Sequence, residues 1–325
     1  MCVIQAEHLT KKYGRKVCVN DLSFELGKNC VLGFIGPNGA GKTTTMRMLC
    51  GIMPPSSGRA FIRGKDVTRF PVEAKSLLGY LPENAPLAGT VTVEDFLKYC
   101  GNMRGLSGKA LKTALERSIE ECDLSSVLQE EAESLSKGFR RRVCLAQAIM
   151  HQPEALVLDE PTDGLDPNQK REIRALIRKL SSKSAVIVST HILEEIDAVC
   201  DRVLTICKGE KVFDGSVQEF KSIIPEKCRM EITVRLPENA KREEAEKCFF
   251  DAPQLGPLLS LTDKKAPLPE RELYFSLTST GENPHPEKEF ISYCMQKNYE
   301  ILSVRTNTPS PDEVFAFLAG GKEEK

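Results

Sequence analysis

The sequence predicts an α/β fold with a mostly parallel sheet, and two patterns carry this prediction. Residues 30–35 form an apolar run, residues 36–44 a glycine-rich loop, and residues 45–49 a run compatible with a helix. A second apolar run ends in two carboxylates, Asp159 and Glu160. In open parallel sheets, ligands gather at the carboxyl ends of the strands. Both loops are therefore expected at one edge of a single sheet.

The length and a change of pattern predict two domains. A chain of 325 residues suits one large and one small domain. After Ile224 the elements are separated by proline-rich loops. We expect a first domain over residues 1–224, with a helical subdomain at about 84–150, and a small α+β domain over residues 225–325.

Apolar periodicity locates the individual elements. In the first domain, strands are predicted at 3–9, 17–26, 59–62, 77–81, 155–160, 185–189, 203–207 and 211–213. Helices are predicted at 45–49, 93–103, 108–122, 139–150 and 168–180, and a turn at 10–14. In the second domain, strands are predicted at 228–236, 273–277 and 299–304, and helices at 240–249, 287–297 and 311–318. A ferredoxin-like split unit with an antiparallel sheet is our hypothesis for this domain.

The glycine-rich loop has the spacing of a phosphate-binding P-loop. It consists of Gly36, Pro37, Asn38, Gly39, Ala40, Gly41, Lys42, Thr43 and Thr44. Glycines let backbone N–H groups turn toward one point, and the N-terminus of the following helix adds its positive dipole end. The Lys42 side chain can reach the β- and γ-phosphates, and the Thr43 hydroxyl is placed to hold Mg²⁺. The loop therefore predicts a nucleotide site.

Residues outside the loop are candidates to complete this site. Asp159 ends an apolar strand and is placed to bind the Mg²⁺ beside Thr43, directly or through water. Glu160, one position later, can polarise an attacking water. His191 follows another apolar strand, where it is either a structural cap or a catalytic group. Tyr13 is either a half-buried aromatic, which spacing alone favours, or a platform on which an adenine ring stacks.

Three consecutive arginines, Arg140 to Arg142, lie in the first turn of the helix expected over 139–150. Positive charge at a helix N-terminus opposes the helix dipole. We therefore expect these side chains to serve something other than the local stability of the helix.

Composition argues against several classes of protein. A net charge of −1 gives no field to attract nucleic acid, so no nucleic-acid partner is expected. Twelve cysteines show no C-x-x-C spacing, which argues against a zinc site or a redox pair and fits a reducing cytosol. The first residues lack the pattern of a secretory signal, and no apolar run reaches the roughly 18–20 residues of a transmembrane helix. We expect a soluble chain, which does not exclude a membrane partner.

Over about residues 3–220, these motifs together resemble the ATP-binding subunits of ABC transporters. Residues 36–44 resemble the Walker A loop, 156–160 the Walker B strand with its catalytic glutamate, 135–139 the signature loop and 163–166 the D-loop. His191 resembles the switch histidine, and Tyr13 the aromatic that stacks on adenine. The resemblance implies a P-loop ABC-type ATPase domain with a parallel core, an antiparallel β subdomain and a helical subdomain, and ATP and Mg²⁺ as its ligands.

The signature loop departs from the usual Leu-Ser-Gly-Gly-Gln. Ser136 and Gly138 are retained, but Lys137 and Phe139 replace the usual residues. This variant resembles the type-two export branch, which serves drug, polysaccharide and gliding-motility exporters.

Two further positions depart from the family pattern. The glutamine-loop residue is identified as Glu83, which also resembles the export branch, and Asp163 is less usual in a D-loop. A glutamate at position 83 can still accept a hydrogen bond from a metal-bound water, so it remains a candidate metal contact.

The resemblance also implies partners. Two copies would hold two ATP molecules head-to-tail, each between the Walker A loop of one copy and Ser136 and Gly138 of the other. Glu160 would orient or deprotonate the attacking water, and His191 would contact the γ-phosphate. A separate polytopic membrane permease would dock on the loop after Glu83 and the helices between 93 and 122. The subunit would then be cytoplasmic and peripheral on the cytoplasmic face of the cell membrane.

The main hypothesis is thus an ATP-hydrolysing subunit that powers a membrane exporter. The alternative is a soluble ABC-type ATPase acting on chromosomes, ribosomes or cluster assembly. The short stretch between Thr44 and Ser136, the single P-loop and the extra C-terminal domain favour the exporter. A non-hydrolysing regulator is disfavoured because Lys42, Asp159, Glu160 and His191 are all present. For the C-terminal domain, a regulatory or dimer-stabilising role and a mere decoration both stay open.

Overall fold

A computed structural model describes residues 2–84, 87, 90–223, 229–237, 240–252, 259–261, 272–278, 286–307, 315 and 318. The chain divides into two compact units, one made of Met1–Lys221 with Phe315–Lys325 and the other of Ser222–Val314. This division places the end of the second unit at Val314, whereas the expected second domain runs to residue 325, and the predicted bounds remain a prediction. The helix predicted at 311–318 lies outside the described residues, apart from Phe315 and Leu318.

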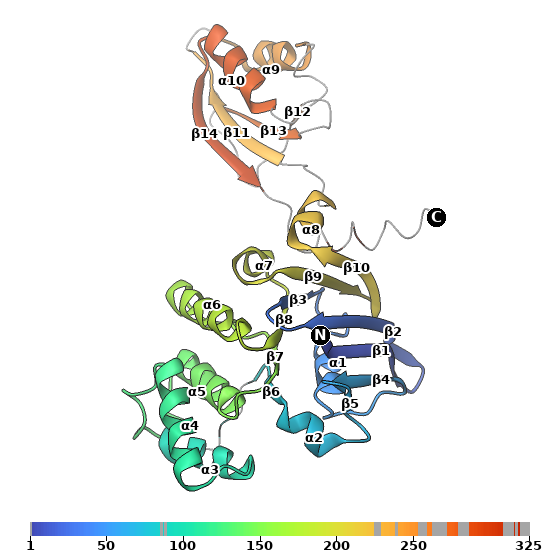
Figure 1. Ribbon diagram of the computed structural model, residues 1–325. Helices are drawn as coiled ribbons and strands as arrows, with labels where there is room; N and C mark the ends of the chain where they lie inside the picture. The colour runs from blue at the N-terminus through green and yellow to red at the C-terminus, as the bar shows by residue number, and fades with distance from the viewer. Residues whose placement is uncertain are drawn as a thin grey trace. The chain divides into compact units, whose positions relative to one another are not determined.

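The first unit is built on a six-stranded sheet with five parallel strands and one antiparallel edge strand (Figure 1). In sheet order these are β10 (Glu210–Ser216), β9 (Arg202–Cys207), β3 (Val31–Ile35), β8 (Ala185–Thr190), β7 (Ala155–Asp159) and β6 (Leu78–Leu81). Every residue of β3, β7 and β8 is buried, as expected for parallel strands covered on both faces. The predicted parallel core is confirmed.

The register of this sheet aligns the loops that carry the candidate residues. Ile35, the last residue of β3, pairs with Thr190 at the end of β8. Asp159, the last residue of β7, pairs with Ser189. The loops after these three strands therefore start side by side at the carboxyl edge, where ligands of open parallel sheets bind.

A second, antiparallel sheet completes the β structure of the first unit. Its strands, in sheet order, are β2 (Lys16–Gly27), β1 (Cys2–Tyr13), β4 (Ser57–Ile62) and β5 (Lys65–Asp66). The predicted turn at 10–14 is wrong, because β1 continues to Tyr13, which pairs with Lys16. Only Gly14, with φ 58°, and Arg15 remain to reverse the chain. The polar side chains that suggested a turn belong to an exposed hairpin.

Three helices form the helical subdomain at the lower left of Figure 1. They are α3 (Val93–Met103), α4 (Gly108–Glu121) and α5 (Lys137–Ile149). The Thr92 hydroxyl accepts a hydrogen bond from the Asp95 amide at 3.2 Å and caps α3, and the Ser136 hydroxyl caps α5. The predicted helical subdomain is thus observed, and these caps fix where α3 and α5 begin.

Five other helices surround the sheets. They are α1 (Lys42–Leu49), α2 (Pro71–Ser76), α6 (Pro167–Ser181), α7 (Leu193–Val199) and α8 (Val217–Ile223). The sequence did not predict α2, α7 or α8, because six or seven residues are too few to show a helical period.

In the part of the chain that the structure describes, no helix is long and apolar enough to span a bilayer.

The three arginines at the start of α5 each reach a different part of the first unit. Arg140 donates to the carbonyls of Glu133 and Leu135 in the preceding loop, and Arg141 donates to the Pro82 carbonyl at 3.1 Å. Arg142 pairs with Asp123 and Glu172. As predicted, they do not serve the local stability of the helix: they fasten the start of α5 to the surrounding segments.

In its described residues, the second unit has a four-stranded antiparallel sheet and two helices. In sheet order its strands are β12 (Leu259–Leu261), β13 (Glu272–Thr278), β11 (Arg229–Arg235) and β14 (Glu300–Asn307), and its helices are α9 (Arg242–Phe250) and α10 (Pro286–Gln296). The chain order β11-α9-β12-β13-α10-β14 gives the ferredoxin-like split topology, which confirms that hypothesis. The buried rings of Phe249, Phe275 and Phe290 pack at the centre of its core.

His151, just after α5, makes the stability of the first unit sensitive to acid. Its Nε2 lies 3.1 Å from the Leu78 carbonyl and 3.3 Å from Arg104 Nη1. Burial, helped by the Arg104 charge, lowers the pKa of His151 from 6.5 to about 4. The unfolded chain therefore binds this proton more tightly. The contribution of this pKa shift to the free energy of unfolding is fully present above pH 6.5. It is lost as the pH falls toward 4.

The variant His151→Gln should accordingly lose less stability on acidification than the native chain. Between pH 7 and pH 4.5 the difference in the loss of unfolding free energy should be roughly 2 kcal/mol. Urea unfolding followed by fluorescence at both pH values measures it. Equal losses in the two proteins would show that His151 is not protonated on unfolding in this range.

Candidate functional site

The P-loop turns tightly between β3 and α1, and two of its glycines, Gly36 and Gly41, pack closely against the backbone of neighbouring segments. A Cβ on Gly36 would lie 2.3 Å from the Ile206 carbonyl oxygen, so a side chain is excluded there. Gly41, with φ 109°, caps α1, and a Cβ on it would lie 2.5 Å from the Cys18 carbonyl oxygen. Gly39, with φ 79°, faces open space. The loop thus leaves its backbone accessible at the N-terminus of α1, as a phosphate requires.

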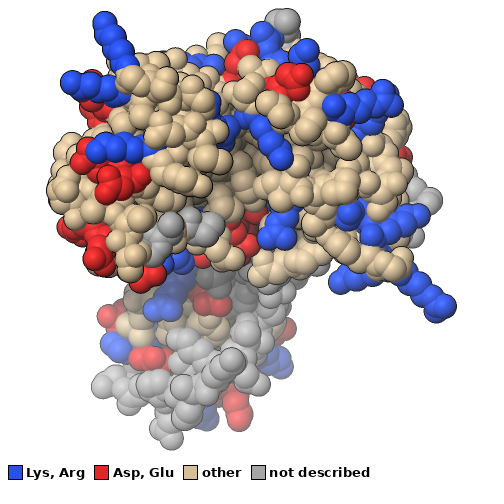
Figure 2. Space-filling model, turned by 90° about the horizontal axis from the view of Figure 1, so that it is seen from below, with Lys and Arg blue, Asp and Glu red and all other residues tan. Residues whose placement is uncertain are grey.

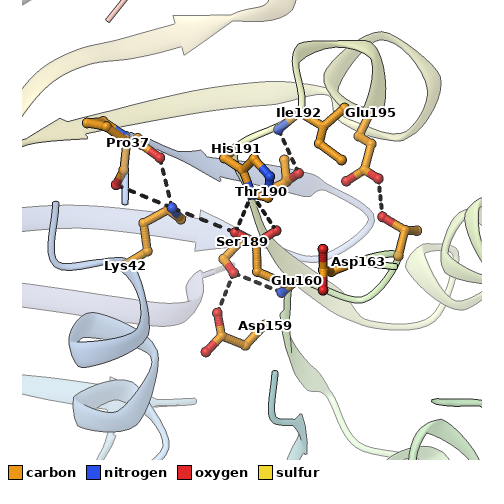
Figure 3. Close-up of polar contacts among 12 residues, drawn as sticks. Pro37, Lys42, Asp159, Glu160, Asp163, Ser189, Thr190, His191, Ile192 and Glu195 are labelled. Carbon is orange, nitrogen blue, oxygen red and sulfur yellow. Dashed lines mark hydrogen bonds and ion pairs between the residues drawn. The ribbon is translucent and has the colours of Figure 1, made fainter. Parts of the chain in front are cut away.

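Lys42 lies folded over the loop and faces the end of β7. Its Nζ donates to the Gly36 carbonyl at 2.8 Å and to the Pro37 carbonyl at 3.4 Å. The same ammonium lies 3.7 Å from Glu160 Oε1, and both side chains are buried (Figure 3). The predicted phosphate-binding lysine and the predicted catalytic carboxylate are therefore brought together.

Glu160 is fixed by its backbone as well as its side chain. It adopts a left-handed conformation with φ 48°, which is uncommon for a residue other than glycine. Its amide donates to the Ser189 hydroxyl at 3.0 Å. Its carboxylate lies 3.0 Å from His191 Nδ1. Burial raises the pKa of Glu160, whereas His191 and Lys42 partly oppose this shift, so the carboxylate becomes a stronger base than an exposed one.

His191 is oriented by Glu160. Because an ionised carboxylate can only accept hydrogen bonds, Nδ1 must carry a proton when it bonds to Glu160. The other ring nitrogen, Nε2, is then directed away from Glu160, and the side chain is 41% exposed. A half-exposed imidazole held in this way suits contact with a ligand better than a role as a structural cap.

Asp159 offers an unsatisfied oxygen at the same edge. The side chain is fully buried, and Oδ1 accepts a hydrogen bond from the Ser189 hydroxyl. Among the described residues, Oδ2 has no hydrogen-bond partner although it is buried. A buried, unpartnered carboxylate oxygen is costly, and a hydrated Mg²⁺ would satisfy it. The site therefore fits the predicted metal ion on the chemistry of this side chain.

Ser136 and Gly138 belong to a second group of residues, at the start of α5. A Cβ on Gly138 would lie 2.7 Å from the Gln169 side chain of α6, and Ser136 is exposed. Glu83 is also exposed and lines a pocket of about 330 Å³ with Asn84, Lys137, Arg140, Arg141 and Asp163. The neighbours of Glu83 in this pocket are thus mainly the cations of α5, and its predicted metal contact remains a prediction.

Tyr13 lies at the end of β1 with 47% of its side chain exposed. Its hydroxyl lies 2.9 Å from Met53 Sδ, and Lys11 Nζ lies 5.5 Å from the ring centre. Its pairing partner Lys16 is two residues from Cys18, whose carbonyl oxygen would lie 2.5 Å from a Cβ on Gly41 of the P-loop. Tyr13 is therefore near the P-loop and available for stacking, and its adenine contact stays a prediction.

Two polar residues that hold the site in place were not predicted from the sequence. Ser189 donates a hydrogen bond to the Asp159 carboxylate and accepts one from the Glu160 backbone amide, but a serine at the end of an apolar strand gives no specific signal. Glu195 of α7 is 3% exposed and accepts a hydrogen bond from the Thr162 hydroxyl (Figure 3). An acidic residue early in a short helix normally indicates a favourable dipole contact, so only the fold reveals this link.

A P-loop lysine, a strand-terminal Asp–Glu pair and a histidine on the Glu define a nucleotide-binding ATPase site. The family model described as ABC transporter matches residues 19–163. The probable multidrug ABC transporter ATP-binding protein YbhF of Escherichia coli K12 is 36% identical over 68% of this chain and 38% of its own length. The linearmycin resistance ATP-binding protein LnrL of Bacillus subtilis 168 is 35% identical over 71% of this chain and 75% of its own length.

A solved structure of a dimeric bacterial ABC transporter cassette has the same fold, with a TM-score of 0.61 at 19% identity. The match covers 66% of this chain and 98% of the cassette. The chain belongs to the ATP-binding proteins of ABC transporters. This confirms the resemblance given by the sequence motifs and favours a transporter ATPase over a soluble one.

Proposed function

We propose that this subunit binds ATP with Mg²⁺ on its P-loop, hydrolyses it, and thereby powers a separate membrane permease that exports its cargo. The observation that carries this proposal is the cluster of buried Lys42 and Glu160 with half-exposed His191, beside the unpartnered Asp159 oxygen. The names of the two relatives, which refer to multidrug transport and linearmycin resistance, support export.

The residues of the cluster take separate roles in this proposal. Residues 36–44 bind the phosphates, and Thr43 and Asp159 hold Mg²⁺, which would neutralise charge that develops on the transferred phosphoryl group. Glu160 accepts the proton of the attacking water. His191 contacts the γ-phosphate through Nε2. These roles use the short distances from Glu160 to both other side chains.

A second copy of the chain completes each nucleotide site. Ser136 and Gly138 lie with the α5–α6 group and contact no member of the Lys42 cluster among the described hydrogen bonds and close approaches. We infer that they serve the nucleotide bound to the partner copy. The dimeric cassette with the same fold supports this arrangement.

An exposed apolar surface on α2 and α3 suits a membrane partner. Tyr99 and Met103, one turn apart on α3, are 62% and 70% exposed, and Val72 on α2 is 77% exposed. Arg104 donates to the Lys75 carbonyl and so joins the ends of these two helices. Figure 2 shows the molecule from below, the side on which α2 and α3 lie in Figure 1, with charged side chains spread over a mostly uncharged surface. Exposed apolar side chains that gather on one face indicate a protein contact.

The test is a pull-down of the tagged chain from detergent-solubilised membranes of its own host. A stoichiometric polytopic protein should co-purify, with about six spans of roughly 20 apolar residues. With the double variant Tyr99→Asp and Met103→Asp, the amount of membrane protein that co-purifies should fall by at least about tenfold, because charge replaces apolar contact area. The variant should still bind ATP. Met295→Asp, the same apolar-to-acid change at an equally exposed position on α10, is the matched control. Recovery only with ribosomal or assembly factors would overturn the transport role.

A further inference from the structure

Two residues that depart from the usual family motifs contact each other. Lys137, the first residue of α5, replaces the usual glycine of the signature loop, and Asp163 is the less usual residue of the D-loop. In the folded chain Lys137 Nζ lies 3.3 Å from Asp163 Oδ2. The two departures therefore compensate one another as an ion pair within one subunit.

The D-loop is shaped to receive this lysine. Gly164 has φ 66°, and a Cβ on it would lie 1.9 Å from Lys137 Nζ and 2.9 Å from Cε. The end of the lysine side chain thus occupies the space in which any other residue at position 164 would place its side chain. Beside it, Gly138 packs against Gln169. The start of α5 is in this way docked on the D-loop and the first turn of α6.

The same D-loop is tied to the catalytic cluster at its other end. The Asp163 amide donates to the Glu160 carbonyl at 3.2 Å. The Thr162 hydroxyl donates to the buried Glu195 carboxylate, and Arg174 Nη2 lies 3.7 Å from the same carboxylate. A shift of the loop at Asp163 would therefore displace the backbone of Glu160. It would also displace α7, which follows His191.

The ion pair itself contributes little to stability. Its side chains are 54% and 47% exposed, and exposed pairs of this kind contribute little in water. We therefore assign the Lys137–Asp163 pair a role in holding the start of α5 at a fixed position relative to the D-loop. We propose that Lys137 is a positioning residue that clamps the start of α5 to the loop following Glu160, so that the two move as one element.

This inference rests on the proposed head-to-tail pair of subunits. There, Ser136 serves the nucleotide of the partner copy, whereas Glu160 acts on the nucleotide of its own copy. The Lys137–Asp163 clamp then joins the two nucleotide sites through a single chain. Loss of the clamp should uncouple the sites and leave the binding of ATP to the P-loop intact.

The experiment measures steady-state ATP hydrolysis by the full chain over a range of ATP concentrations. Lys137→Ala and Asp163→Ala should each lower kcat by about 2- to 5-fold, the range that a pair of this exposure can couple. Each should also reduce cooperativity in ATP, with KM nearly unchanged. The double variant should be no worse than either single one. The reversed pair, Lys137→Asp with Asp163→Lys, should recover most of the activity.

Two controls make the result decisive. Lys112→Ala breaks another exposed pair of the helical subdomain, Lys112 with Glu116 at 3.9 Å, and should leave kcat and cooperativity unchanged. Hydrogen exchange of residues 161–166 in the nucleotide-free chain tests the clamp without any turnover, and Lys137→Ala should accelerate it. Unchanged exchange, or additive effects in the double variant, would overturn the clamp. If the native chain neither binds nor hydrolyses ATP, the proposed function fails, and the exchange result still decides on the clamp.

Discussion

Glu160→Gln should lower ATP turnover by about 10²- to 10⁴-fold, the usual contribution of a general base, while ATP binding is retained. The amide has the same shape as the carboxylate but cannot accept the proton of the attacking water. The backbone of residue 160 is held by Ser189 and does not depend on the side chain. The replaced side chain can still contact His191, so the P-loop should be undisturbed.

This expectation is checked by phosphate release at saturating ATP, together with nucleotide binding measured by calorimetry. If two subunits enclose ATP as proposed, the variant should also accumulate as an ATP-bound dimer on size exclusion. Glu116→Gln, an exposed carboxylate on α4, is the matched control and should hydrolyse ATP normally. Normal turnover in Glu160→Gln would remove Glu160 from the catalytic role.

Lys42→Ala should weaken ATP binding by about 10- to 100-fold, which corresponds to the loss of charge-assisted hydrogen bonds to the phosphates. The loss should be larger than for any surface lysine, because Lys42 is buried and its ammonium is held over the loop by the Gly36 and Pro37 carbonyls. Turnover should fall as well, since Glu160 loses the cation 3.7 Å from its carboxylate.

Calorimetric titration with ATP and with ADP measures this effect. Both nucleotides should bind more weakly, and ATP should lose more, because the lysine is expected at the β- and γ-phosphates. Lys112→Ala should bind both nucleotides as the native chain does. Equal affinity of Lys42→Ala and the native chain for ATP would place the nucleotide elsewhere.

Local patterns in the sequence were enough to predict the main architecture. The apolar runs that became β3, β7 and β8 had to be buried on both faces, which only a covered parallel sheet allows. Helices α3 and α4 have the predicted bounds to within one residue, because their apolar period is long enough to be seen. The short helices α2, α7 and α8 gave no such period, and the extension of β1 to Tyr13 depended on its pairing with Lys16.

The sequence by itself determined the P-loop, the strand-terminal carboxylates and the family, because these depend on residue type and spacing along one stretch of chain. Only the tertiary structure decided which distant side chains meet. Register alone brings Ser189 to Asp159, and the left-handed turn at Glu160 brings its carboxylate to both His191 and Lys42. The contact of Lys137 with Asp163 likewise joins residues that are 26 positions apart. Such contacts are set by the packing of whole elements, which no local pattern encodes.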